Sequence, residues 1–377
     1  MFPVCCLRLS LLTMFGLFVV TDAHAAGPSL GDAVRQADSK YLEAPETGAA
    51  GSSPKIMVGG GEDGLAPLDE EISLGKLRVT LTYVAEASAK KPAGKRALQD
   101  IPEEAMLPDE MGLGEVVPHA PVVTVYLDEP APVISPADDE TDMSADGAEA
   151  SPGGPRIVAT LKGNSNGSSD PPVSMQIAEL DPNNPYPEIV VSFFSGGAHC
   201  CSVTHIITSN ADGSDWKTID VGEFDGGPML AVDLDGNGIY EFETRDNAFL
   251  YAFACYACSQ APLQVLALKD GKLNDVSTEA RFKPAHAAWL KSMIVGVPEE
   301  DVNGFLAGYV AQKTRLGEGK QAWGLMLKHH DRKADQGLEI CDRPRNKAGK
   351  CPGKTTSVAF PDALKHKLKE NGYRIEG

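Results

Sequence analysis

Oxygen-bearing side chains stand at alternate positions of the chain between residues 233 and 241. Hard cations such as Ca²⁺ take six to eight oxygen ligands, and this spacing lets alternate groups face one centre. Gly236 and Gly238 supply the backbone freedom that such a curled loop needs. The pattern predicts a structural Ca²⁺ site with these ligands: Asp233, Asp235, Asn237, Ile239 through its backbone carbonyl, and Glu241.

The flanks of this loop distinguish it from a helix-flanked calcium sensor. An EF-hand has Glu at position 12 of its loop, where this chain has Thr244, and it needs a helix on each side. Both flanks are instead typical of strands. The loop resembles the Asp-x-Asp-x-Asn-Gly-x-x-Glu loops of FG-GAP or VCBS-type repeats, found in integrin-α-like propellers. That resemblance implies a blade-like β-fold and the same calcium ligands.

A weaker copy of the loop lies upstream, where Asp181 aligns with Asp235 at an offset of 54 residues. Prolines stand where the second copy has glycines, and they fix φ and stiffen the backbone. We therefore expect weaker metal binding here, and the alternative is a loop that holds its shape without metal. Its candidate ligands are Glu179, Asp181, Asn183 and Glu188.

The repeat extends beyond the two loops, because Cys201 aligns with Cys255 at the same offset. Each copy reads as four short strands, which favours a propeller blade or half of a sandwich. Residues 173–282 are therefore predicted to form a two-repeat, blade-like antiparallel β-domain. Upstream, residues 69–172 read as scattered strands with linkers, and three of these strands are expected to join that domain. They span residues 77–84, 122–127 and 156–161.

The two ends of the chain have different compositions. Residues 1–25 read as a cleaved secretory signal peptide, and residues 26–68 as a disordered acidic and Gly-rich segment. Residues 283–377 have helical periodicity and carry 17 basic against 11 acidic residues, whereas residues 173–282 carry 5 against 16. The predicted fold class is therefore α+β, with a small basic helical domain after the β-domain.

Six cysteines follow the signal peptide, and an even count in an exported protein favours disulfides. Two bonds between the equivalent segments of the repeats would account for Cys200, Cys201, Cys255 and Cys258. Zinc ligation by this cluster with His199 and His205, or a redox-active Cys255-x-x-Cys258 pair, are the alternatives. Cys341 and Cys351 are expected to close their own basic loop, the best candidate for an anionic ligand.

No catalytic signature is evident in the sequence. We therefore predict an exported, periplasmic or extracellular protein that acts as a calcium-stabilised binding or structural module. The whole chain resembles uncharacterised secreted bacterial proteins, so this resemblance implies no activity. The partner is expected to be a protein, a glycan or an anionic envelope component. Nucleic acid is excluded by the net charge of −19, and no transmembrane segment is expected after signal removal.

The competing hypothesis is a secreted hydrolase with its site between the β-domain and the helices. An acidic cleft that contains His199 and Asp246, with a carboxylate of raised pKa, would favour it.

Overall fold

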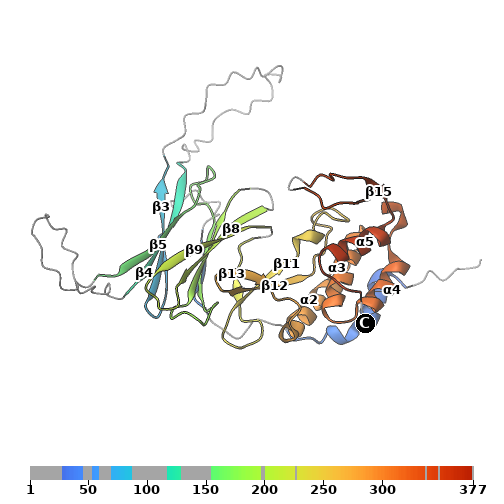
Figure 1. The fold of residues 1–377 in the computed structure, drawn as a ribbon, viewed down its shortest axis with the longest axis horizontal. Helices are drawn as coiled ribbons and strands as arrows, with labels where there is room; N and C mark the ends of the chain where they lie inside the picture. Colours follow the sequence, from blue (N-terminus) through green and yellow to red (C-terminus); the bar gives the residue numbers. More distant parts are fainter. Residues whose placement is uncertain are drawn as a thin grey trace, which may run out of the picture.

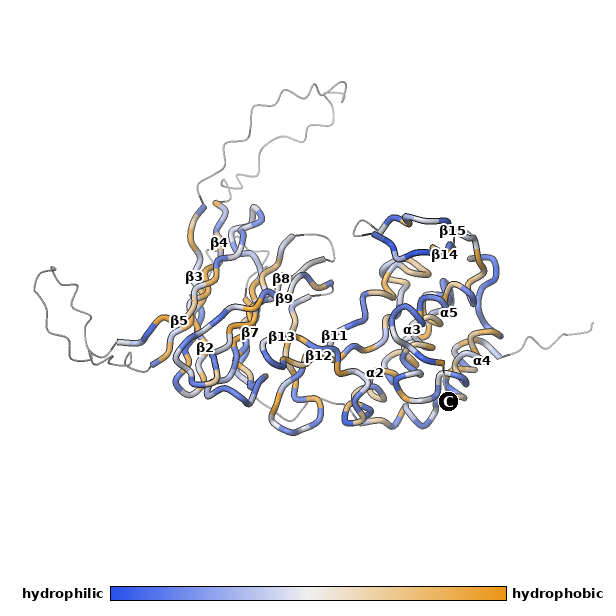
Figure 2. The backbone as a smooth tube through the Cα atoms, viewed as in Figure 1, coloured by the Kyte–Doolittle hydropathy of each residue, from blue (hydrophilic) through white to orange (hydrophobic). Residues whose placement is uncertain are grey.

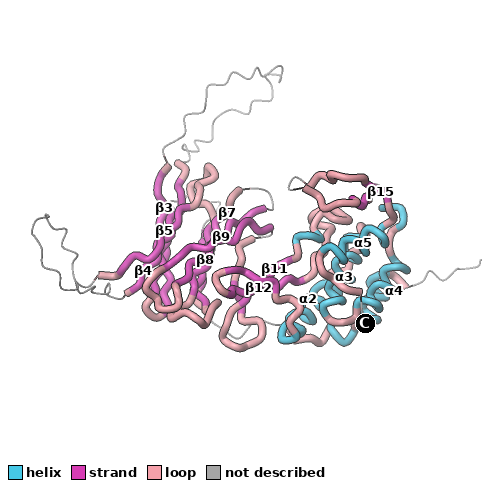
Figure 3. The backbone as a smooth tube through the Cα atoms, in the orientation of Figure 1, coloured by secondary structure: helices cyan, strands magenta, loops and turns pink. Residues whose placement is uncertain are grey.

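The computed structural model describes residues 28–45, 53–58, 69–86, 117–128, 154–196, 200–225, 227–335, 338–346 and 349–375, with the backbone alone at 200 and 201. Within these ranges, antiparallel sheets are followed by C-terminal helices, an α+β arrangement (Figure 1, Figure 3). The predicted signal peptide lies outside the described residues. None of the described helices has the length and apolar character needed to cross a bilayer.

Three sheets of antiparallel strands make up the β-region. The first contains β2 (Glu70–Leu74), β3 (Leu77–Ala85), β4 (His119–Leu127) and β5 (Arg156–Lys162). The second contains β1 (Lys55–Val58), β6 (Val173–Ala178), β7 (Glu188–Phe194), β8 (Cys200–Ser209) and β9 (Trp216–Asp225). The third contains β10 (Ala231–Val232), β11 (Glu241–Arg245), β12 (Leu263–Lys269) and β13 (Lys272–Asp275). The three upstream strands predicted from the sequence are confirmed, and with β2 they form a sheet of their own.

The first and second sheets pack face to face. Side chains of β3 and β4, such as Leu81 and Val125, share one buried cluster with Met175 of β6 and Val191 of β7. Figure 2 shows that these facing strands are among the most hydrophobic segments of the chain. All six residues of β6 are buried. A strand without alternation is covered on both faces, so the second sheet lies between two other layers.

The third sheet covers the opposite face of the second. Val190 and Ile206 of the second sheet pack with Phe242 and Leu268 of the third. The other face of the third sheet contacts the start of the helical region, where Val265 shares a cluster with Phe282 and Ala285. The molecule is thus a stack of three sheets followed by helices (Figure 1).

The helical periodicity of the C-terminal region is confirmed by four helices. They are α2 (Lys283–Val295), α3 (Val302–Arg315), α4 (Gly319–His329) and α5 (Phe360–Glu370). A two-stranded ladder of β14 (Glu339–Cys341) and β15 (Thr355–Ser357) precedes α5. α3 is buried from Asn303 to Lys313, so it forms the centre of the group. Phe305, Tyr309 and Val310 lie in its largest apolar cluster.

Part of the segment predicted to be disordered is ordered, and this corrects the prediction for residues 26–68. Helix α1 (Leu30–Ala37) is capped by Ser29, whose hydroxyl accepts a hydrogen bond from the backbone N–H of Asp32. Val34 is buried in the same cluster as the C-terminal helices, and α1 lies beside them (Figure 1, blue). The physical reason is tertiary: a short helix with little intrinsic stability forms when its apolar face is packed.

A buried ion pair fixes this contact between the two ends of the chain. The ammonium of Lys313 contacts the carboxylates of Asp38 and Glu318, and both Lys313 and Asp38 are fully buried. The hydroxyl of Tyr309 also donates to Asp38. Burial raises the pKa of Glu318, but hydrogen bonds from Lys313, Lys40 and Tyr41 outweigh it and hold the pKa at about 2. Glu318 is therefore ionised over the whole physiological range.

A neutral histidine connects the β-region to the helices. His286 Nε2 lies 2.8 Å from the carbonyl oxygen of Ser277, and its Nδ1 lies 3.1 Å from Nε2 of Gln312. Gln312 also accepts from the backbone N–H of Leu263, the first residue of β12. With Nε2 as donor and Nδ1 as acceptor, every polar atom of the imidazole is satisfied without a charge. Burial lowers the pKa of His286 to about 4.

Lys313→Met should cost about 3–5 kcal/mol of unfolding free energy, because it leaves the buried Asp38 carboxylate without its counter-ion. Urea denaturation measures the loss, and Lys320→Met on the exposed face of α4 serves as the control. The double variant Asp38→Asn/Lys313→Met should recover part of the loss. A loss below about 1 kcal/mol in the single variant would contradict the buried pair.

Acid should destabilise the fold through His286. Its pKa is about 4 in the folded chain and about 6.5 unfolded, so the unfolded state binds more protons between these values. The unfolding free energy is therefore expected to fall by at most about 3 kcal/mol as the pH drops from 6.5 to 4. Denaturation at several pH values tests this. His286→Phe should flatten that slope, whereas the same change at the partly exposed His329 should not.

Candidate metal centre

The two acidic loops occupy equivalent places in neighbouring sheets. One joins β6 to β7 and the other joins β10 to β11. Each following strand begins with a fully buried glutamate, Glu188 or Glu241. Glu188 accepts from the backbone N–H of Leu180, and Glu241 from that of Leu234. Leu180 and Leu234 keep the offset of 54 residues, but Glu188 and Glu241 do not. The first loop is therefore one residue longer than the second, and the additional residue lies between Leu180 and Glu188.

The second loop is preorganised by its own backbone. Asp233 accepts hydrogen bonds from the N–H groups of Gly236, Asn237 and Gly238, at 2.7, 3.0 and 3.0 Å. The two glycines have φ of +76° and +85°, the left-handed region that they were predicted to supply. The side-chain oxygen of Asn237 accepts from the N–H of Ile239. The loop is therefore closed around Asp233 by protein donors.

A cationic side chain that the sequence pattern did not predict contacts this loop. Nη1 of Arg281 lies 2.9 Å from Oδ2 of Asp235 and 2.9 Å from Oε1 of Glu241. The guanidinium also pairs with Glu279 and lies over the ring of Phe282. Two of the predicted ligand oxygens therefore face one position where a positive charge is stabilised.

The charge at this position is only partly balanced. Asp233, Asp235 and Glu241 contribute three carboxylates, and Arg281 contributes one positive charge. Burial raises the pKa of Glu241 to about 7, against the lowering effect of the Leu234 N–H and of Arg281. The residual negative charge fits a cation.

The geometry of this loop nevertheless differs from that of a preformed metal site. In the described part of the chain, the carboxylate oxygens of these three residues do not all lie within 4.8 Å of one another. Asp233 directs both oxygens to backbone N–H groups, and Arg281 holds one oxygen of each of the other two. Metal binding would therefore require Arg281 to release Asp235 and Glu241.

The first loop satisfies its acid with neutral donors. Glu188 accepts from the N–H groups of Leu180 and Asp181, from Nδ2 of Asn184 and from the hydroxyl of Thr208. Asn183 donates its side-chain amide to Asp181. These contacts favour the alternative in which this loop keeps its shape without metal.

Glu179 lies at the junction of the two loops. Its backbone oxygen accepts from the N–H of Tyr240 at 2.7 Å, which joins the first loop to the second. Its side-chain Oε1 is buried and has no hydrogen-bond partner among the described residues. Burial, with the nearby charges of Glu188 and Asp181, raises the pKa of Glu179 to about 7. This carboxylate is the least well satisfied acid of the pair of loops.

The structure corrects the predicted disulfide pairing. Cys255 is bonded to Cys258, three residues away, and not to the segment at residues 200–201. The physical reason is that residues 255–258 form a tight turn, with the N–H of Cys258 bonded to the carbonyl of Cys255. These sulfurs are therefore unavailable to the alternative zinc cluster. The side chains of Cys200 and Cys201, and all of His199, lie outside the described residues.

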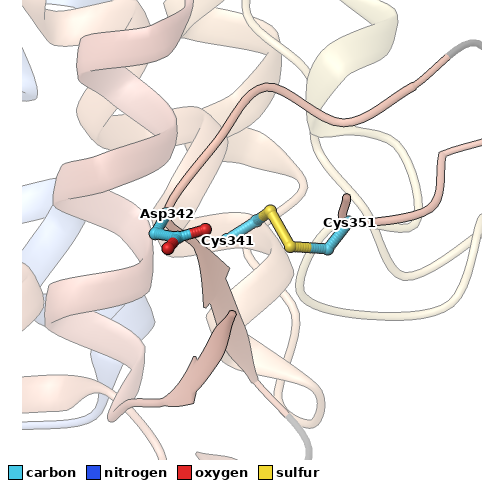
Figure 4. Close-up of side chains that lie close together, drawn as sticks. All are labelled: Cys341, Asp342 and Cys351. Carbon is cyan, nitrogen blue, oxygen red and sulfur yellow. A yellow bond between two sulfur atoms is a disulfide. The ribbon is translucent and has the colours of Figure 1, made fainter. Parts of the chain in front are cut away.

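Cys341 and Cys351 close the basic loop as predicted. With Asp342 they are the only described residues whose metal-ligating atoms gather in a group of three or more (Figure 4). The two sulfurs are bonded to each other, so this group is a disulfide beside a carboxylate. A cavity of about 320 Å³ adjoins it, with both signs of charge in its wall. Its charged and ionisable residues are Glu339, Arg345, His366, Lys367 and Glu370.

The hydrolase hypothesis gains no support at Asp246. One carboxylate oxygen accepts from the N–H of Ala248, and the other accepts from the hydroxyl of Tyr373 in the helical region, at 2.8 Å. The first contact caps the short turn at Asn247–Phe249, and the second attaches Tyr373 to the segment after β11. Both contacts are therefore structural.

Comparison with known proteins gives matches to parts of the chain. Residues 285–372, from α2 to the end of α5, match a family described as the sll0997 C-terminal domain. The chain is 42% identical over 223 residues to the probable thylakoid lumen protein sll0997 of Synechocystis sp., covering 58% of this chain and 65% of that protein. It is 36% identical over 222 residues to the uncharacterized protein y4bJ of Sinorhizobium fredii, covering 58% of this chain and 35% of that protein. No solved structure matches.

Glu179→Gln should make the chain more stable at pH 8 in the presence of a chelator, with little change at pH 5. The folded-state pKa of about 7 exceeds the ordinary value of 4.5. The folded state therefore binds more protons between these values, and stability falls as the pH rises. The side-chain amide of Gln cannot ionise, so the variant does not lose this stability as the pH rises. Melting temperatures at both pH values test this, with the exposed Asp215→Asn as the control. An equal shift in melting temperature at both pH values would contradict the raised pKa of Glu179.

Proposed function

We propose that this chain is an exported binding or structural module whose second acidic loop is stabilised by Ca²⁺. The observation that carries the proposal is the position of Arg281 between the carboxylates of Asp235 and Glu241. A side-chain cation there neutralises only part of the loop's charge. A divalent cation neutralises more, and Ca²⁺ accepts the irregular oxygen geometry of such a loop.

In this proposal, Arg281 and Ca²⁺ compete for the same carboxylates. Arg281 is one-third exposed, so its guanidinium has room to turn toward solvent. Asp233, Asp235, Asn237, the carbonyl of Ile239 and Glu241 would then hold the metal. The loop between β10 and β11 would thereby be cross-linked, and the third sheet would be stabilised as a blade-like unit of the FG-GAP or VCBS type.

Export is supported by three observations of different kinds. The first 25 residues have the composition of a cleaved signal. Two disulfides, Cys255–Cys258 and Cys341–Cys351, are typical of an oxidising compartment. A relative at 42% identity is named as a probable lumen protein. We therefore propose a periplasmic or extracellular location, with a protein, glycan or anionic envelope component as partner.

Arg281→Gln provides the sharpest test of the calcium proposal. In chelator, the variant should melt below the wild type, because Asp235 and Glu241 lose their only described cationic partner. In millimolar Ca²⁺ the wild type should gain stability, about 2.7 kcal/mol at one hundred times the dissociation constant. The variant should gain more, because the competing cation is gone. Calorimetry in both buffers measures the two increments.

Two controls separate this effect from general stabilisation by salt. Arg78→Gln removes another arginine–glutamate pair, in the first sheet, and should leave the Ca²⁺ increment unchanged. Mg²⁺, which prefers strict octahedral geometry, should give a smaller increment than Ca²⁺. Equal melting temperatures with chelator and with Ca²⁺, in both the wild type and Arg281→Gln, would rule out the calcium role.

A further inference from the structure

An exposed disulfide lies at the surface of the long segment between β11 and β12. Cys255 and Cys258 form the bond with two residues between them, and Cys255 is exposed. The proposed calcium role does not involve this pair. A disulfide of such short span at the surface is accessible to an attacking thiolate.

The segment that carries this bond is held rigidly against α3. A Cβ atom at Gly304 would lie 2.6 Å from the carbonyl oxygen of Cys258, and one at Gly308 would lie 1.8 Å from that of Gln260. Only glycine allows the two backbones to approach so closely. The indole of Trp289 on α2 also donates to the carbonyl of Ala261. The turn is therefore fixed by contacts that do not depend on the sulfur–sulfur bond.

The turn also places a donor at one of the sulfurs. The backbone N of Cys258 lies 3.2 Å from Sγ of Cys255. The hydroxyl of Ser259 donates to the carbonyl of Cys255 and fixes the same turn. In the reduced pair this N–H would stabilise a thiolate on Cys255, because a thiolate is favoured by nearby hydrogen-bond donors. Cys255 thus carries the exposed sulfur of the oxidised pair. In a mixed disulfide with a substrate, its stabilised thiolate is also a good leaving group.

A cavity lies beside the turn that carries the disulfide. It has a volume of about 370 Å³ and is formed by residues 256, 257 and 259–261, which flank Cys258, together with β11 and α2. Arg245, Tyr256 and Trp289 supply a positive charge and two aromatic faces. Such a wall suits an extended peptide segment, which the aromatic rings and the cation can hold against the turn that carries the two cysteines.

We propose that Cys255–Cys258 is a thiol–disulfide exchange site that oxidises a dithiol in a peptide or protein. A thiolate of the substrate attacks Sγ of Cys255, the Cys255–Cys258 bond breaks, and the Cys258 thiolate leaves and takes a proton. The second substrate thiolate then attacks the substrate sulfur of the mixed disulfide, and the Cys255 thiolate leaves. Two electrons and two protons pass from the substrate dithiol to the cysteine pair.

The test uses the full mature chain and a synthetic peptide with two cysteines. Under anaerobic conditions, oxidised wild-type protein should convert the reduced peptide to its disulfide in a one-to-one ratio. Mass spectrometry of alkylated products should find Cys255 and Cys258 reduced, with Cys341–Cys351 still bonded. The variant Cys255→Ser/Cys258→Ser should give no conversion. An unreacted peptide, or reduction confined to Cys341–Cys351, would overturn the proposal.

Single variants separate an exchange site from a merely accessible structural bond. In Cys258→Ser, Cys255 should react with iodoacetamide at least tenfold faster at pH 7 than Cys258 does in Cys255→Ser. Its pH profile should have a midpoint below the ordinary thiol value of about 8.5. Equal rates with ordinary midpoints would refute the exchange role. Both single variants should melt near the wild-type temperature, because Gly304, Gly308 and Trp289 hold the turn, and marked destabilisation would favour a structural bond.

Discussion

The buried ammonium of Lys313 is the constraint on which the helical region depends. A fully buried lysine in the last turn of a helix is costly unless carboxylates neutralise it. One of them, Asp38, comes from the opposite end of the chain, and the other, Glu318, follows α3 directly. The N-terminal helix is therefore an integral part of the C-terminal fold. The same centre supports the junction to the β-region, since Gln312 precedes Lys313 and bonds both His286 and Leu263.

The two acidic loops stabilise a buried glutamate in two different ways. Each places a buried glutamate at the start of a strand, where backbone N–H groups of the loop donate to it, two in the first loop and one in the second. The first loop completes the set with neutral groups, Asn184 and Thr208. The second has no such groups among its described contacts and takes Arg281 instead. The glutamate of the first loop is thus held by neutral donors alone, whereas that of the second is paired with a cationic side chain.

Local patterns in the sequence predicted the parts of the fold that depend on local forces. Alternation predicted β3 and β4, helical periodicity predicted α2 to α5, and the glycines of the second loop predicted its left-handed turns. Arg281 and the Asp38–Lys313 pair were missed, because no local pattern indicates a partner 40 or 275 residues away. The cysteine pairing was wrong for a related reason: the alignment of the repeats suggested distant partners, whereas the turn at residues 255–258 brings two cysteines together locally.

The separation of 275 residues between Asp38 and Lys313 also sets an order of assembly. A chain made from its N-terminus presents α1 first, but the surface that orders α1 exists only after α3 has been made. The first and third sheets have consecutive strands and can form in turn as they appear, and the second sheet recruits β1 from a position upstream of the first sheet. The first helix in the sequence is then among the last elements to reach its final place. Completion of the molecule is thereby coupled to the presence of both ends of the chain.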